Sequence, residues 1–156
     1  MSTNPLVKLK LGCGDKILGV YANVDVAESR AGRRPDILCN FRALTPFEDN
    51  SADEILSVHV VKHFGRWEVV GVLKEWARVL KPGGRMVLKC PNLKSACESI
   101  LANPDFHTGP GPGGQRTMWE FYGDSSWRDP LMVHRCGYTP QRFAAIMAEA
   151  GLMNIR

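Results

Sequence analysis

The sequence lacks the cysteine patterns that mark zinc sites and thioredoxin-like redox sites, because no two of its cysteines are separated by two residues. An odd number of cysteines without a recognisable signal peptide is typical of a reducing compartment, so we expect a cytoplasmic protein. No hydrophobic run approaches the length of a membrane span, which predicts that no membrane is involved. The cysteines are Cys13, Cys39, Cys90, Cys97 and Cys136.

The sequence also has little excess charge. Its 20 basic and 16 acidic residues give a net charge of +4, and the basic residues are scattered along the chain. Arg33 and Arg34 are the only adjacent arginines, and no basic stripe is present. A mixed, solvated surface explains this pattern, and a nucleic-acid partner is therefore unlikely on charge alone.

What is present fits one α/β domain of 156 residues. Short apolar runs that stop at turn residues predict five strands, at residues 6–11, 21–26, 36–39, 53–58 and 85–90. Apolar residues at three-to-four spacing predict a helix over 66–80, which Pro82 and Gly83 would end. Further helices are expected over 93–102 and 140–150. A strand, a helix and a strand in that order predict a parallel crossover in an open sheet.

Residues 103–137 differ from the rest. The glycine- and proline-rich run at 109–114 is not expected to hold regular structure. Four aromatic residues follow it, which a structureless linker would not need, so the segment is interpreted as a lid over a site. A poorly ordered surface excursion is the alternative. The aromatics are Trp119, Phe121, Tyr122 and Trp127.

Three motifs carry the functional argument. Gly12-Cys13-Gly14 ends the first predicted strand in a turn that lets the main chain approach a ligand. Asp25 ends the second strand, and Pro82-Gly83-Gly84 leads into the fifth. A dinucleotide fingerprint is disfavoured, because it requires a third glycine where the chain has Ile17.

At these residues the chain resembles the class I S-adenosylmethionine-dependent methyltransferases, especially the short type 11 branch. The resemblance covers about residues 6–93 and, weakly, 137–156. It implies a Rossmann-like, doubly wound, mostly parallel sheet, with a short turn in place of the first helix. The family sheet has two more strands, so we expect the last one or two to be lacking. The lid or a second subunit in a homodimer would then cover the edge of the fifth strand.

The resemblance also implies the cofactor, S-adenosylmethionine, and the residues that bind it. The glycine turn would lie against the methionine moiety, and Asp25 would accept hydrogen bonds from both ribose hydroxyls. Asn40 could read the adenine amino group or be an ordinary turn residue. His59 could line the site, act as a base, or be a packed histidine. The expected cofactor-binding residues are Gly12, Cys13, Gly14, Asp25, Val26, Asn40, Phe41 and His59.

Two departures accompany these expectations. Lys62 stands where the family usually has glutamate, which reverses a charge at the rim of the site. His59 and His63 have the spacing of a zinc-binding helix, but Val60 replaces the glutamate that such a motif requires, so no metal is expected.

The resemblance implies a methyltransferase that acts on a small molecule or a glycan precursor. His134 and the lid aromatics are candidates for acceptor binding and equally for packing of the lid. No catalytic residue is identified. A non-catalytic module that keeps the fold, and the ligand, is the alternative.

Overall fold

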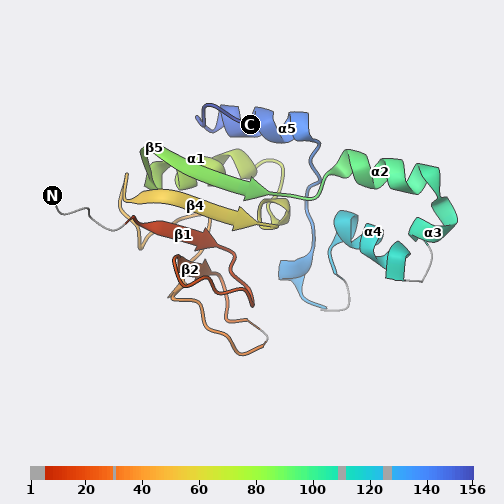
Figure 1. The fold of residues 1–156 in the computed structure, drawn as a ribbon, viewed down its shortest axis with the longest axis horizontal. Coiled ribbons are helices and arrows are strands. Elements are labelled where there is room, and N and C mark those ends of the chain that lie inside the picture. Colours follow the sequence, from red (N-terminus) through yellow and green to blue (C-terminus); the bar gives the residue numbers. More distant parts are fainter. Residues whose placement is uncertain (1–5, 30, 109–111, 125–127) are drawn as a thin grey trace.

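The computed structural model describes residues 6–29, 31–108, 112–124 and 128–156, and it contains a sheet of five parallel strands. The strand order is β3-β2-β1-β4-β5 (Figure 1). The strands are β1 (Lys8–Leu11), β2 (Ala22–Asp25), β3 (Ile37–Leu38), β4 (Ala52–Val58) and β5 (Leu80–Lys89). The predicted Rossmann-like arrangement is confirmed, and every pairing in it is parallel.

The order of the strands creates a switch point. From β1 the chain moves outward to β2 and β3, and it then returns to the other side of β1 to form β4 and β5. The connections that follow β1 and β4 therefore lead away to opposite sides of the sheet, and open α/β sheets bind ligands in the crevice outside such a point. The register places Leu11 beside Ser57, so the two strands end side by side.

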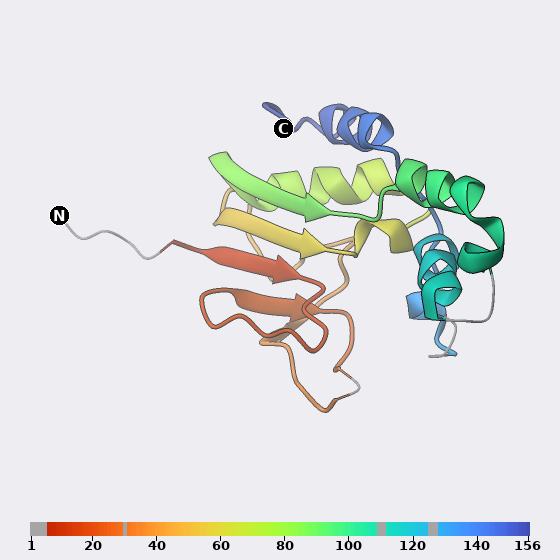
Figure 2. The ribbon, with the colours of Figure 1, turned by 45° about the vertical axis from the view of Figure 1, so that its right-hand side comes forward.

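The first crossovers are unusually short. No helix lies between β1 and β2 in the described chain, which confirms the expected short turn. The described residues between β2 and β3, 26–29 and 31–36, contain no helix either. The first helical segments after β4 are η1 (Val61–His63) and α1 (Val69–Val79). Helix α1 lies along one face of the sheet (Figure 2).

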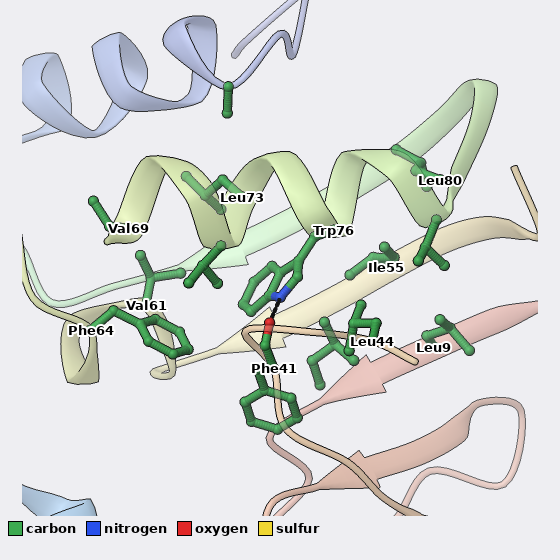
Figure 3. Close-up of a cluster of buried hydrophobic side chains, with 14 of the residues drawn as sticks. Leu9, Phe41, Leu44, Ile55, Val61, Phe64, Val69, Leu73, Trp76 and Leu80 are labelled. Carbon is green, nitrogen blue, oxygen red and sulfur yellow. Dashed lines mark hydrogen bonds between the residues drawn. The ribbon is translucent and has the colours of Figure 1, made fainter. Parts of the chain in front are cut away.

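The core lies between α1 and the sheet. One stripe of α1 is fully buried, as its three-to-four spacing predicts, and Trp76 is its largest member. The Trp76 indole points toward the loop after β3, where its nitrogen donates a hydrogen bond to the carbonyl oxygen of Phe41 at 2.9 Å (Figure 3). The rings of Phe41 and Phe64 both lie edge-on to Trp76, so α1, η1 and this loop form one packed unit.

The fifth strand begins earlier than expected. The helix ends at Val79, and β5 starts directly at Leu80 instead of at residue 85. Leu80 pairs with Ala52, and a register shift then separates this pair from the regular ladder that begins at Glu54 and Arg85. The Pro82-Gly83-Gly84 run lies inside this irregularity, where Gly83 adopts a φ of +79°.

The described part of the segment between β5 and the last helix is mostly helical, and the expectation of no regular structure was wrong for residues 112–114. It contains α2 (Leu93–Ala102), α3 (Pro104–Thr108), α4 (Pro112–Tyr122) and η3 (Pro130–Met132). Pro112 through Gly114 belong to α4, while 109–111 and Trp127 lie outside the described residues. These helices extend beyond the carboxyl ends of the strands and do not run along the outer edge of β5 (Figures 1 and 2). The last helix, α5 (Pro140–Glu149), lies against α1.

Candidate functional site

The glycine turn follows β1 at the switch point. Gly12 and Gly14 both have positive φ, at +76° and +49°, a region that side chains other than glycine rarely adopt. The two glycines differ in their surroundings. A Cβ atom on Gly12 would lie 2.1 Å from a methyl group of Val60, whereas one on Gly14 would meet nothing within 4 Å. The turn therefore packs against the loop after β4 at Gly12 and is open beside Gly14.

Asp25 lies at the end of β2, next to this turn. One of its carboxylate oxygens accepts a hydrogen bond from the amide of Gly14 at 2.8 Å, and the other accepts from the amide of Val26 at 2.7 Å. A carboxylate has about four acceptor positions, and the Cys13 thiol also lies within hydrogen-bonding reach of this one, so capacity remains for at least one further donor. The carboxylate is thus fixed by the main chain at the edge where ribose hydroxyls were expected.

Cys13 lies inside the turn and is buried. Burial, with the nearby Asp25 carboxylate, raises the pKa of its thiol to about 11. The thiol is therefore protonated at neutral pH, and it lacks the thiolate character of a nucleophile. Cys13 packs as a small buried side chain within the turn.

Asn40 and Phe41 follow β3. The side-chain oxygen of Asn40 accepts a hydrogen bond from the amide of Arg42 at 3.0 Å, which is the geometry of a turn residue. Phe41 is 5% exposed, and its ring packs in the core against Trp76. The expected adenine contacts at these two positions stay predictions, since Asn40 would have to share its oxygen and Phe41 offers little free ring surface.

His59 follows β4 directly and has a φ of +63°. Such a conformation costs free energy in a residue other than glycine, and it recurs at functional sites. Its amide donates to the carbonyl oxygen of Lys89 at 2.8 Å, which ties the end of β4 to the end of β5. Burial, together with neighbouring lysines, lowers the pKa of His59, so its imidazole is neutral at pH 7.

Two further histidines, His63 and His134, contact each other near His59. The rings of His63 and His134 are 5.0 Å apart and nearly perpendicular, although the two residues come from η1 and from the chain that returns from α4. The Nδ1 atom of each lies 3.0 Å from a carbonyl oxygen, Val133 for His63 and Glu120 for His134. A carbonyl oxygen only accepts, so both Nδ1 atoms carry the proton and both Nε2 atoms keep a lone pair.

The surroundings keep these imidazoles neutral. Burial, with the positive charge of Lys62, lowers the pKa of His134 to about 4 and also lowers that of His63. The main-chain oxygen of Lys62 accepts hydrogen bonds from the amides of Arg135 and Cys136, which fixes the returning segment to η1. The sequence singled out His63 and His134 separately, but no spacing rule indicated that they touch.

Two further properties of the described residues concern metal ions and membranes. No cluster of three or more histidine, cysteine or acidic side chains suited to a metal ion occurs within the described ranges. None of the helices in that part of the chain is long and apolar enough to cross a membrane.

Comparison with known proteins places this geometry in a family context. The model of a family described as "Methyltransferase domain" matches residues 19–88, a range that includes Asp25, Asn40, Phe41 and His59 but not the glycine turn. None of the curated proteins matches the chain in sequence.

Solved structures match over nearly the whole chain. A SAM-dependent methyltransferase from Archaeoglobus fulgidus is 16% identical with a TM-score of 0.60, and the match covers 97% of this chain and 62% of that one. A SAM-dependent methyltransferase from Thermotoga maritima is 18% identical with a TM-score of 0.57, covering 93% and 63%. The trans-methyltransferase CalH, in a complex with S-adenosylhomocysteine (SAH), is 14% identical with a TM-score of 0.53, covering 94% and 44%.

At identities this low, the likeness establishes the fold, and the chain spans less than two thirds of the length of each of these structures. The chain has the class I S-adenosylmethionine-dependent methyltransferase fold, and its residues 19–88 match the methyltransferase domain family.

Proposed function

We propose that the protein binds S-adenosylmethionine and transfers its methyl group to a small-molecule or glycan-precursor acceptor. The observation that carries the proposal is the Asp25 carboxylate, which the amide of Gly14 holds at the switch point of the sheet at 2.8 Å. Residues 1–156 act as one domain in this proposal, with 103–137 as a lid over the site.

The residues at the switch point fit the cofactor. Asp25 has free acceptor capacity for ribose hydroxyls, and the side of the turn at Gly14 is open. Cys13 and Val26 line the same edge of the sheet, with Asn40 and Phe41 on the far side of β2. His59, whose backbone is held in an uncommon conformation, closes the site from the end of β4.

The chemistry asks little of the protein. A bound S-adenosylmethionine supplies an electrophilic methyl group. The chain must then orient the acceptor, exclude water and, where the acceptor loses a proton, provide a base. The unprotonated Nε2 atoms of His63 and His134 can accept hydrogen bonds from a polar methyl acceptor, whereas a pKa of about 4 makes His134 a weak base.

Titration calorimetry with S-adenosylmethionine and S-adenosylhomocysteine tests the proposal. Asp25→Asn removes the charge that strengthens the ribose hydrogen bonds, and we expect it to weaken the binding of both ligands roughly 10- to 100-fold. Glu149→Gln also removes one carboxylate charge, at an exposed position of α5 outside the proposed lid, and as the control it should bind as the wild type does. A wild-type protein that binds neither ligand would end the proposal.

A non-catalytic module is the second candidate, and one observation favours it. Lys62 places a positive charge on η1 where the related family usually has glutamate, and burial lowers the pKa of its ammonium group. A protein that binds both ligands but releases no S-adenosylhomocysteine with any fraction of a polar metabolite extract would match this reading. Release of the product with one fraction would exclude it and would identify the acceptor.

A homodimer also belongs to the proposal. In the described part of the chain β5 pairs only with β4, which leaves one edge of the sheet unpaired, and α2 to α4 lie elsewhere. Light scattering of the purified protein at several concentrations tests this expectation, and a monomeric mass throughout would contradict it.

A further inference from the structure

A cavity outside the predicted cofactor site has no role in the proposed methyl transfer. It has a volume of about 380 Å³ and lies where the first residues of α1, α2 and α5 meet the segment 135–139. This volume is within the range of small-molecule sites. Tyr138 fixes the geometry: its carbonyl oxygen accepts a hydrogen bond from the amide of Leu93 at 2.9 Å, which joins the segment to the start of α2.

Three arginines surround the cavity, namely Arg66, Arg135 and Arg142. All three are exposed, and none forms an ion pair with the residues that the structure describes. The Glu68 carboxylate interacts electrostatically with Arg135, but both of its oxygens accept hydrogen bonds from Arg42. Three guanidinium groups, none of them in an ion pair with a described residue, therefore line one hollow.

This arrangement differs from the other arginines of the sheet and its helices. Arg42, Arg78 and Arg85 each reach a carboxylate within 3 Å. Unpaired guanidinium groups that gather at one place suit a multivalent anion, because their planar forks match phosphate and carboxylate oxygens.

The walls of the cavity are apolar. Val69, Tyr138 and Ile146 form its buried floor, and the half-buried Leu93 and Cys136 provide accessible apolar surface. Tyr138 is 3% exposed, and its hydroxyl makes no hydrogen bond although the Cys136 thiol lies near it. A site for a bare ion would not need these surfaces, whereas a ligand with an apolar body would bury part of its own surface against them.

The helix ends add to the positive field. Residue Thr139 caps α5, where its hydroxyl accepts from the amide of Arg142 at 3.2 Å, and the first turns of α1 and α2 open on the same hollow. The amino end of each helix carries a partial positive charge. The arginines, the helix ends and the apolar walls thus select for the same kind of ligand.

We propose that this cavity binds a phosphate monoester with a compact apolar or aromatic body. The phosphate lies among Arg66, Arg135 and Arg142, and the body packs against Leu93 and Cys136. The site is separate from the crevice at Asp25, and ligand binding to it does not depend on methyl transfer.

Titration calorimetry with phenyl phosphate, inorganic phosphate and phenol tests this assignment. We expect phenyl phosphate to bind at least tenfold more tightly than either of the other probes, because only it uses both the arginines and the apolar walls. Arg135→Gln and Arg142→Gln should each weaken its binding roughly tenfold. Arg33→Gln makes the same charge change at an exposed position far along the chain and should leave the affinity unchanged.

Three outcomes would overturn the proposal. They are equal affinities for phenyl phosphate and inorganic phosphate, no effect of the two cavity variants, and an equal loss in Arg33→Gln, which would indicate unspecific attraction. Asp25→Asn separates this site from the proposed function. It should keep phenyl phosphate binding while it loses S-adenosylmethionine binding, so each proposal can fail while the other stands.

Discussion

The indole nitrogen of Trp76 donates a hydrogen bond to the carbonyl oxygen of Phe41 at 2.9 Å, and this bond joins the centre of α1 to the loop after β3. Both partners are buried, so neither can exchange the bond for one to water. The loop that it fixes also carries Asn40, one of the expected adenine contacts.

Trp76→Phe should therefore destabilise the protein markedly. The smaller ring leaves a void, and the Phe41 carbonyl oxygen loses its donor, so we expect the free energy of unfolding to fall by roughly 2–4 kcal/mol. Trp67→Phe makes the same change at a side chain that is 85% exposed and should alter stability by less than about 0.5 kcal/mol. Urea unfolding followed by circular dichroism measures both, and equal losses would show that the buried bond is unimportant.

The two glycines of the turn should respond differently to alanine. Gly14→Ala meets open space, so only its positive φ is penalised and the cost is about 1–2 kcal/mol. Gly12→Ala adds a clash with a Val60 methyl group, so its cost should be clearly larger, and Val60→Ala in the same chain should recover part of it. Thermal unfolding of the three variants checks this order. If Gly14→Ala destabilised the protein more than Gly12→Ala, contact with Val60 would not be what restricts the size of the residue at position 12.

Stability should fall as the pH drops from neutral. His134 has a pKa of about 4 in the folded protein because burial and the charges of Lys62, His63 and His59 oppose its protonation, whereas the ordinary value is 6.5. The unfolded chain thus binds a proton first, and stability that is present above pH 6.5 is lost progressively down to pH 4. For a half-buried group the loss is about 1–2 kcal/mol.

His134→Gln removes this titration. Urea unfolding at pH 7.5, 6 and 5 should then give a shallower decline for the variant than for the wild type, with the remainder due to His59 and His63, whose pKa values are also lowered. An identical decline in both proteins would mean that the pKa of His134 is the same in the folded and the unfolded protein.

Local signals predicted most of the elements. Asn92 and Thr139 are side-chain caps in the structure, and the helices that they begin lie where the sequence places them. The weak point was α4, because a pair of glycines argues against a helix. Pro112 stands at the first position of α4, where proline favours a helix. Packing of α4 against α2 and α3 stabilises it further, and helix propensities of single residues do not include this contribution.

The candidate site likewise has one part that the sequence predicts and one part that it does not. Asp25 and Gly14 follow neighbouring parallel strands, so their proximity follows from the fold. The contact of His63 with His134 and the gathering of three arginines depend on where the chain returns from α4. That path is set by packing between distant segments, and no periodicity in the sequence encodes it.

The central position of β1 also constrains how the protein is made. The amide of Val7, just before this strand, bonds to the carboxylate of Asp53, 46 residues later, at the start of β4. During synthesis β1 therefore leaves the ribosome well before one of its two neighbours exists, and its exposed edge must wait for that partner. Until β4 has been synthesised, the unpaired edge of β1 is a place where the nascent chain can pair with a strand of another molecule.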